Sequence, residues 1–172
     1  AVKTPGEKIF PYIQKNLDDI ITVDDDELVV AFLDMVENHK MVIENSGLLT
    51  VAALKHLNVK DKRIVSILSG GNMDVITMSS VVQQGLIFRD RIFTVSVLLP
   101  DKPGELSRVA DTIAKEQGNV IKLEHNQFVS INRSAAVELR ITLEAFGTDH
   151  KKQIMKALEK NGYKPKLVRT NL

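Results

Sequence analysis

The chain has no cysteine, and aromatic residues make up only 5% of its 172 residues. Without cysteine it can form no disulfide and carry out no thiolate chemistry, a composition that fits a cytoplasmic protein. The few aromatic side chains form no stacking run of the kind that binds single-stranded nucleic acid. All apolar runs are shorter than the about 20 residues of a membrane-spanning helix, and no signal-peptide pattern is visible. We therefore expect a cytoplasmic globular protein that binds neither nucleic acid nor a membrane.

Charge is distributed unevenly along the chain. Residues 1–90 contain 9 Lys and Arg against 13 Asp and Glu, a net charge of −4. Residues 91–172 contain 14 against 9, a net charge of +5. The basic residues of the second part are scattered, which argues against a nucleic-acid surface. A chain of this length can hold one domain or two small ones, and the charge difference favours two.

The first part alternates short β-branched runs with amphipathic helical patterns. Runs at residues 19–23, 41–43 and 64–68 predict strands of a parallel sheet. Helix caps are predicted at Thr4, Asp24, Ser46 and either Asn72 or Asp74. The fold class is therefore α/β, with a partial parallel sheet. Three strands are too few for a sheet with two covered faces, so we expect this part to belong to a larger domain.

Four consecutive acidic residues, Asp24-Asp25-Asp26-Glu27, precede one of these helices. They could bind a metal ion, or they could form a capping box in which Asp24 caps the helix and Glu27 closes the box. We favour the capping box, because acidic side chains stabilise a helix N-terminus. No spacing typical of a metal site occurs elsewhere, so no metal ligand is predicted.

The second part predicts a ferredoxin-like unit with the order β-α-β-β-α-β. The predicted strands cover residues 92–99, 119–128, 135–143 and 163–169, and the predicted helices cover residues 105–117 and 150–160. A tight turn is predicted at Pro100-Asp101-Lys102-Pro103-Gly104, and a polar turn at residues 130–132.

The run Ser69-Gly70-Gly71-Asn72 follows the third β-branched run directly. Ligands of open α/β sheets bind at the carboxyl ends of the strands, and paired glycines let a ligand approach the bare backbone. The residues alone leave two interpretations open: the floor of a ligand site, or a tight strand-to-helix turn without a ligand.

Residues 92–172 resemble an ACT domain, a βαββαβ module that binds amino acids and regulates metabolic enzymes. The resemblance rests on Asp101-Lys102-Pro103-Gly104-Glu105-Leu106 and Gly118-Asn119-Val120. It implies a homo-oligomer of paired ACT domains and a small-molecule amino-acid effector bound by Asp101, Pro103, Gly104, Glu105, Asn119 and Val120. Backbone N–H groups at the helix start would bind the ligand carboxylate, and Asp101 would bind its ammonium group. The alternative is a well-formed turn without a ligand.

Residues 1–88 resemble the C-terminal part of the catalytic domain of threonine ammonia-lyases (threonine dehydratases). These are pyridoxal-phosphate enzymes of the tryptophan-synthase-β fold, fold type II. The matching segments are residues 1–6, 18–20, 44–47 and 68–72, and residues 144–150 resemble the late part of the ACT domain in that family. The resemblance covers the whole chain in one order.

The resemblance implies a set of cofactor-binding residues. Ser69 takes the position of a hydroxyl or thiol against the pyridine nitrogen, and Gly70, Gly71 and Asn72 lie near the ring. A serine contact leaves that nitrogen unprotonated, so the ring is a weaker electron sink, which favours β-elimination. Glu44 takes a position near the cofactor edge, although Glu-Asn-Ser-Gly departs from the commoner Glu-x-Ala-Gly. Its alternative role is that of an acid at a helix entry.

Two parts of that family's site have no match in this sequence: the lysine that binds the cofactor and the glycine-rich phosphate cup. Lys55, Lys60 and Lys62 stand in polar surroundings at helix ends, unlike a lysine activated by burial. No catalytic residue is therefore predicted, and we expect the chain alone to be inactive. The parent enzyme implied is an allosterically regulated lyase of isoleucine biosynthesis that converts L-threonine to 2-oxobutanoate and ammonia. The alternatives are a stand-alone amino-acid-binding regulatory protein and a serine-directed lyase of the same fold.

Overall fold

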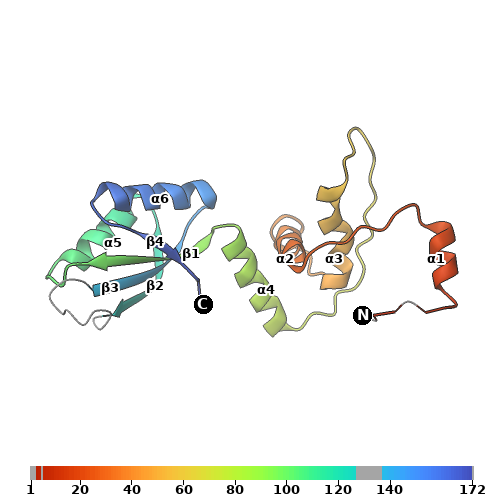
Figure 1. The fold of residues 1–172 in the computed structure, drawn as a ribbon, viewed down its shortest axis with the longest axis horizontal. Coiled ribbons are helices and arrows are strands. Elements are labelled where there is room, and N and C mark those ends of the chain that lie inside the picture. The colour runs from red at the N-terminus through yellow and green to blue at the C-terminus, as the bar shows by residue number, and fades with distance from the viewer. Residues whose placement is uncertain (1–2, 5, 127–136, 172) are drawn as a thin grey trace.

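A computed structural model describes residues 3–4, 6–126 and 137–171 (Figure 1). The first group of elements comprises α1 (Phe10–Asn16), α2 (Asp25–Asp34), a π-helical turn (Met35–His39), α3 (Asn45–Ala52), a 3₁₀ turn (Ala53–His56) and α4 (Val75–Phe88). The second comprises β1 (Ile92–Leu99), α5 (Glu105–Lys115), β2 (Asn119–Asn126), β3 (Val137–Glu144), α6 (Thr148–Lys160) and β4 (Lys166–Val168). Among these described residues, no helix is both long enough and apolar enough to cross a membrane.

The four strands form one antiparallel sheet in the order β2-β3-β1-β4. The register of β1 against β3 runs from Ile92 opposite Glu144 to Leu99 opposite Val137. The predicted βαββαβ unit and the α/β class are thereby confirmed. The last strand is shorter than predicted, because the Tyr163 N–H still donates to the Leu158 carbonyl at the end of α6. The polar turn predicted at residues 130–132 lies outside the described residues.

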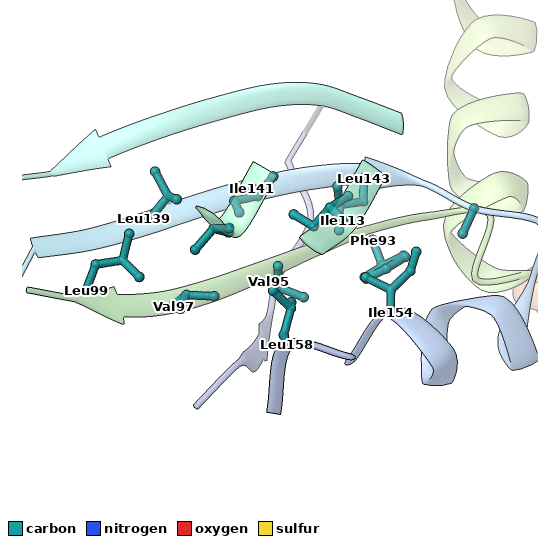
Figure 2. Close-up of a cluster of buried hydrophobic side chains, with 12 residues drawn as sticks. Phe93, Val95, Val97, Leu99, Ile113, Leu139, Ile141, Leu143, Ile154 and Leu158 are labelled. Atoms are coloured by element: carbon teal, nitrogen blue, oxygen red, sulfur yellow. The ribbon is translucent and has the colours of Figure 1, made fainter. Parts of the chain in front are cut away.

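A hydrophobic core fills the space between the sheet and helices α5 and α6 (Figure 2). Alternate residues of the two central strands point into it, because side chains of a strand alternate between faces. They are Phe93, Val95, Val97 and Leu99 on β1 and Leu139, Ile141 and Leu143 on β3. Val109 and Ile113 on α5, and Ile154 and Leu158 on α6, lie four residues apart and so share one helix face. The sheet and its two helices thus bury a core formed by their own side chains, and the second group of elements is a two-layer unit.

A second core lies among α2, α3 and α4, where Phe32 and Leu48 are fully buried and Val81 packs against them. The capping box at the start of α2 is confirmed: the Asp24 N–H donates to the Glu27 carboxylate at 3.0 Å. Glu27 also contacts Lys55 Nζ at 2.5 Å and His56 Nε2 at 3.0 Å. The acidic run is therefore a helix start.

Glu27 makes the stability of this part depend on pH. The hydrogen bond from Lys55, with that from His56, lowers the Glu27 pKa from 4.5 to about 2. A carboxyl with a lowered folded pKa stabilises the fold above its unfolded pKa, and this contribution is lost as pH falls through the folded value. We expect thermal unfolding midpoints to fall more steeply between pH 4.5 and 2 in the wild type than in Glu27→Gln. Gln retains the capping acceptor, and Glu7→Gln, an exposed site, is the matched control. Parallel profiles for the wild type and Glu27→Gln would contradict the prediction.

The parallel sheet predicted in the first part is wrong for this chain. Residues 19–23, 41–43 and 64–68 are not paired as strands, and every strand pair among the described residues belongs to the antiparallel sheet. Val65 and Ile67 are 90% and 72% exposed. A strand needs a neighbour to satisfy its backbone N–H and C=O groups, and the described residues supply none for these runs.

Two predicted helix starts are also wrong. The first helix begins at Phe10 instead of near Thr4, with Pro11 in its first turn and no buried residue. Helix α3 begins one residue before Ser46, because Glu44 takes the N-cap position. The prediction for α4 is confirmed: the Asp74 carboxylate accepts from the N–H groups of Ile76 and Thr77.

Candidate functional site

The residues predicted to bind the cofactor lie together where residues 67–72, here called the glycine loop, run beside the start of α3. The Glu44 N–H donates to the Gly70 carbonyl at 3.4 Å. In return, the Asn72 N–H donates to Glu44 Oε2 at 3.2 Å. Glu44 and the glycine loop are thus joined by two hydrogen bonds although they are more than 20 residues apart in sequence.

The Glu44 carboxylate is held at both oxygens, since the Ser46 hydroxyl donates to Oε1 at 2.6 Å. Gly70 has φ +80°, and a Cβ added there would lie 2.4 Å from the Glu44 carboxyl carbon. Glycine at position 70 therefore permits both the left-handed backbone and the close approach of the carboxylate. The arrangement fixes a negative charge directly beside the glycine loop.

Two further residues that hold the glycine loop were not identified from the sequence. A Cβ added at Gly47 would lie 1.8 Å from the Ser69 carbonyl oxygen, so α3 and the loop touch through bare backbone. The Thr50 hydroxyl donates to the Ile67 carbonyl at 2.9 Å. The signal for Gly47 was the glycine that Glu-Asn-Ser-Gly shares with the family pattern Glu-x-Ala-Gly. Thr50 carried no signal, because its role is visible only once the loop is in place.

The chemistry of these side chains tests whether they fit pyridoxal phosphate. Ser69 is exposed and offers a hydroxyl, which is suited to a ring nitrogen. The Asn72 N–H, which could bind a phosphate oxygen, is taken by Glu44. No Lys or Arg of the described residues forms an ion pair with Glu44. The loop therefore offers a hydroxyl beside bare glycine backbone and contains no cation that could pair with a phosphate.

The residues predicted to bind the effector fall into two groups at opposite ends of the sheet. Gly104, with φ +91°, caps α5 directly after the turn that follows Leu99. Asn119 lies opposite Glu144, which lies opposite Ile92 at the other end of β1. The two ends are separated by the seven residue steps from Ile92 to Leu99, about 23 Å at about 3.3 Å per step. Within one chain, Asn119 and Val120 therefore do not meet Asp101, Pro103, Gly104 and Glu105.

A cleft of about 500 Å³ lies beside the turn, between α5 and the segment after α6. Its lining includes Pro100, Glu105, Arg108, Asp111 and Tyr163. Arg108 donates to Glu105 at 3.0 Å. Burial and the neighbouring Glu105 raise the Tyr163 pKa above its usual value of 10. The volume of the cleft lies in the range of pockets that bind small organic molecules. Its cationic and anionic side chains could pair with the two charges of a zwitterion. Arg108 and Tyr163 were not predicted, because their proximity arises only from the packing of the segment after α6 on α5.

No protein-family model matches the chain. It is 34% identical over 165 residues to the L-threonine ammonia-lyase of Geobacter sulfurreducens, a match covering 95% of this chain and 41% of that protein. It is 30% identical over 169 residues to the L-threonine ammonia-lyase of Thermotoga maritima, covering 98% and 42%. The resemblance to the threonine ammonia-lyases is thereby confirmed. The chain spans about two fifths of the length of these two curated relatives.

Another relative of the threonine ammonia-lyase kind is the biosynthetic L-threonine dehydratase of Pasteurella multocida, 28% identical over 167 residues and covered to 31% of its length. Among solved structures, the prephenate dehydratase of Streptococcus mutans matches with 21% identity and a TM-score of 0.38, covering 44% of this chain and 40% of that one. The ACT domain of the Bacillus anthracis prephenate dehydrogenase matches with 20% identity and a TM-score of 0.34, covering 42% and 99%. The fold assignment rests instead on the strand order and register.

Among the residues that the structure describes, no group of three or more His, Asp or Glu side chains is placed to hold a metal ion. His150 lies in the first turn of α6. It is half-buried and joins two segments: its Nδ1 accepts from the Phe146 N–H at 3.0 Å, and its Nε2 lies 2.6 Å from the Glu116 carbonyl.

Proposed function

We propose that the chain is part of a threonine ammonia-lyase that converts L-threonine to 2-oxobutanoate and ammonia. Residues 1–88 belong to its catalytic domain, and residues 92–172 form an ACT domain that binds a regulatory amino acid. The observation that carries the proposal is the meeting of Glu44 with the glycine loop, together with similarity over nearly the whole chain to two L-threonine ammonia-lyases.

In this proposal the chain supplies the ring side of the cofactor site. Pyridoxal phosphate, when bound, supplies the electron sink for bond breaking at the amino-acid Cα. The Ser69 hydroxyl would contact the ring nitrogen, and Gly70 and Gly71 would let the backbone lie close to the ring. Glu44 positions the loop through its hydrogen bond from the Asn72 N–H. Lys55 is engaged with Glu27 at 2.5 Å, so it is not free to bind the cofactor. We expect the chain alone to lack catalytic activity.

A complementation experiment tests the catalytic assignment. The chain is co-expressed with the part of the Geobacter sulfurreducens relative that lies outside the match, and 2-oxobutanoate is measured after addition of threonine. We expect activity from the pair and none from either piece. Ser69→Ala should lower the activity of the pair, and Ser66→Ala, three residues earlier, is the matched control. Comparing serine with threonine as substrate separates a serine-directed lyase from the proposed one.

Two results would overturn the catalytic assignment. Borohydride reduction of the chain with pyridoxal phosphate, read by mass spectrometry, should give no specific lysine adduct. A single-site adduct would show that the chain holds its own cofactor lysine. Inactivity of a well-folded pair, with effector binding intact, would favour the stand-alone regulatory protein.

The proposed effector is a small amino acid bound in the cleft beside α5. Arg108 would pair with its carboxylate and Asp111 with its ammonium group, since charge-assisted hydrogen bonds are the strong ones in such sites. Calorimetry with isoleucine, valine, threonine and serine tests this. We expect at least one to bind, and Arg108→Gln to weaken that binding about tenfold, the loss of one charge-assisted hydrogen bond. Lys152→Gln, which removes an exposed charge on α6, should leave binding unchanged.

The proposed oligomer pairs two ACT domains through β2. This strand is exposed along its whole length, and its Val120, Ile121 and Leu123 are exposed apolar residues. An unpaired, apolar edge strand favours pairing with another strand. Antiparallel pairing of β2 with β2 would bring Asn119 of one copy to the end of the sheet where the turn at Gly104 of the other lies. That would reunite the two groups of predicted effector residues.

Light scattering after gel filtration tests the pairing. Leu123→Glu should convert the dimer to a monomer, because it places a charge in the proposed interface. Leu167→Glu on the opposite edge strand is the control, since Leu167 is also exposed, 52% against 40% for Leu123, and lies outside the proposed interface. Dissociation by both substitutions, or by neither, would contradict pairing through β2.

A further inference from the structure

The face of the sheet turned away from the core carries three buried polar residues. Thr94 and Ser96 on β1 and Thr142 on β3 alternate with the core residues, so their side chains point to the opposite face. They are only 6%, 7% and 4% exposed. Polar side chains are mostly exposed to solvent in proteins. Three buried hydroxyls on the outer face of a sheet are therefore unusual, and what surrounds them is informative.

A small cavity of about 90 Å³ lies over the hydroxyls of Thr94 and Thr142, whereas the Ser96 hydroxyl donates to Glu138 at 2.6 Å. Its lining includes Thr94, Thr142, Lys122, Arg140 and Arg169. Lys122, Thr142, Thr94 and Val168 lie opposite one another in successive strands, so all four strands contribute to one row across the sheet. The register therefore sets the positions of Thr94, Thr142 and Lys122, and Arg169 follows directly after Val168, the last residue of β4.

The floor of the cavity has a proton to donate. The hydroxyl oxygens of Thr94 and Thr142 lie 3.0 Å apart and share one hydrogen bond. Each hydroxyl carries one proton, and the bond between them uses only one of the two. The other proton is available to an acceptor above the floor.

The rim of the cavity is cationic. Lys122 contacts Glu124 at 2.7 Å, and Arg140 contacts Glu138 at 3.2 Å, whereas Arg169 forms no ion pair with any residue that the structure describes. Glu124 is the single carboxylate in the lining, against three cations. Arginine offers five donors in a planar fork that matches an oxyanion. An anion is therefore the ligand that these groups would attract.

The volume decides the size of that anion. About 90 Å³ is roughly the liquid volume of three water molecules, at about 30 Å³ each, and far below the roughly 300 Å³ of organic-ligand pockets. We propose that Thr94, Thr142 and Arg169 form a binding site for a tetrahedral oxyanion, either inorganic phosphate or the phosphate group of a larger ligand that remains outside. This site shares no lining residue with the cleft beside α5 and does not depend on the proposed function.

Amide chemical shifts of the ¹⁵N-labelled chain, titrated with inorganic phosphate at constant ionic strength, test the site. We expect saturable shifts at Thr94, Thr142 and Arg169. Arg169→Gln should weaken phosphate binding about tenfold, the loss of a charge-assisted contact. Thr142→Val, which keeps the shape and removes the hydroxyl, should also weaken it. Lys60→Gln, with the same charge change at a distant exposed site, should leave the Kd unchanged.

A second titration with methyl phosphate distinguishes the two sources of the anion. Equal or tighter binding of methyl phosphate assigns the site to a phosphate group of a larger ligand, and weaker binding assigns it to the free ion. The proposal is overturned by shifts that do not saturate, or by an Arg169→Gln protein that folds and binds both anions like the wild type.

Discussion

Replacing Gly47 with Ala is expected to lower the free energy of unfolding of the first part by about 1–3 kcal/mol, the usual cost of overpacking. The added Cβ would lie 1.8 Å from the Ser69 carbonyl oxygen and 2.7 Å from a methyl carbon of Ile43. A backbone carbonyl cannot rotate away alone, so the glycine loop must move off α3. Better helix propensity of Ala, about 0.5–1 kcal/mol, offsets only part of this. Urea unfolding followed by far-UV circular dichroism measures the loss.

Gly71→Ala is the matched control for Gly47→Ala. The atom nearest to its added Cβ would be the Val42 carbonyl oxygen at 3.5 Å, which is an ordinary van der Waals contact. We expect a change within about 0.5 kcal/mol, typical of surface substitutions. Hydrogen exchange at the Asn72 amide gives a local readout, because that N–H is bonded to Glu44 only while the loop is in place. Faster exchange in Gly47→Ala and not in Gly71→Ala is expected; equal losses in both would show that α3 does not position the loop.

The sequence was sufficient for the ferredoxin-like unit because its strands find their partners within 80 residues. Val95 and Leu139 alternate with polar neighbours in their own strands, and Ile154 and Leu158 repeat at helix spacing, so each local pattern agrees with the final packing. The run at residues 64–68 has an equally good strand pattern but no neighbouring strand among the described residues. Pattern alone predicts which segments can be strands, whereas a partner decides whether they are.

The candidate site also contains contacts that could be predicted from the sequence and contacts that could not. The Asp74 cap could be predicted because its partners lie two and three residues away. The meeting of Glu44 with Asn72 could be predicted only through the family resemblance, since no local pattern links residues 28 apart. Arg108 and Tyr163 line the same cleft only because of tertiary packing, and no spacing in the sequence predicts that they lie close together.

The second large effect is expected at Asp90, in the short segment between α4 and β1. Asp90 has φ 54°, a left-handed backbone that is uncommon outside glycine, asparagine and aspartate. Its carboxylate accepts from Lys151 Nζ at 2.7 Å and from the Thr148 hydroxyl at 2.8 Å. On either side of it, Arg89 and Arg91 both contact Glu37 in the π-helical turn that follows α2. Adjacent residues of this segment therefore contact different parts of the chain: Asp90 contacts α6, and the two arginines contact Glu37 in the helical part.

Asp90→Ala should therefore lower the free energy of unfolding by about 1–3 kcal/mol, the cost of unpaired polar groups, with further strain from alanine at positive φ. Asp90→Asn should cost less, because asparagine tolerates the backbone and can still accept from Thr148. Urea unfolding at pH 7 measures both. Equal losses for Ala and Asn would mean that only the Lys151 ion pair matters.

The Asp90 prediction also carries a pH dependence with a definite sign. Burial raises the Asp90 pKa, but the hydrogen bonds from Lys151 and Thr148 outweigh it, so the pKa lies below its ordinary 3.8. Its charge therefore stabilises the fold above about pH 3.8, and this contribution is lost as pH falls through the lowered folded value. The stability difference between the wild type and Asp90→Asn should be full at pH 7 and shrink steadily below pH 3.8. A constant difference would show that the carboxylate acts through its shape alone. A stability difference that shrinks at low pH would show that charge pairs fix the segment between α4 and β1 on both sides. The Asp90 carboxylate binds Lys151 of α6, and Glu37 binds the flanking arginines.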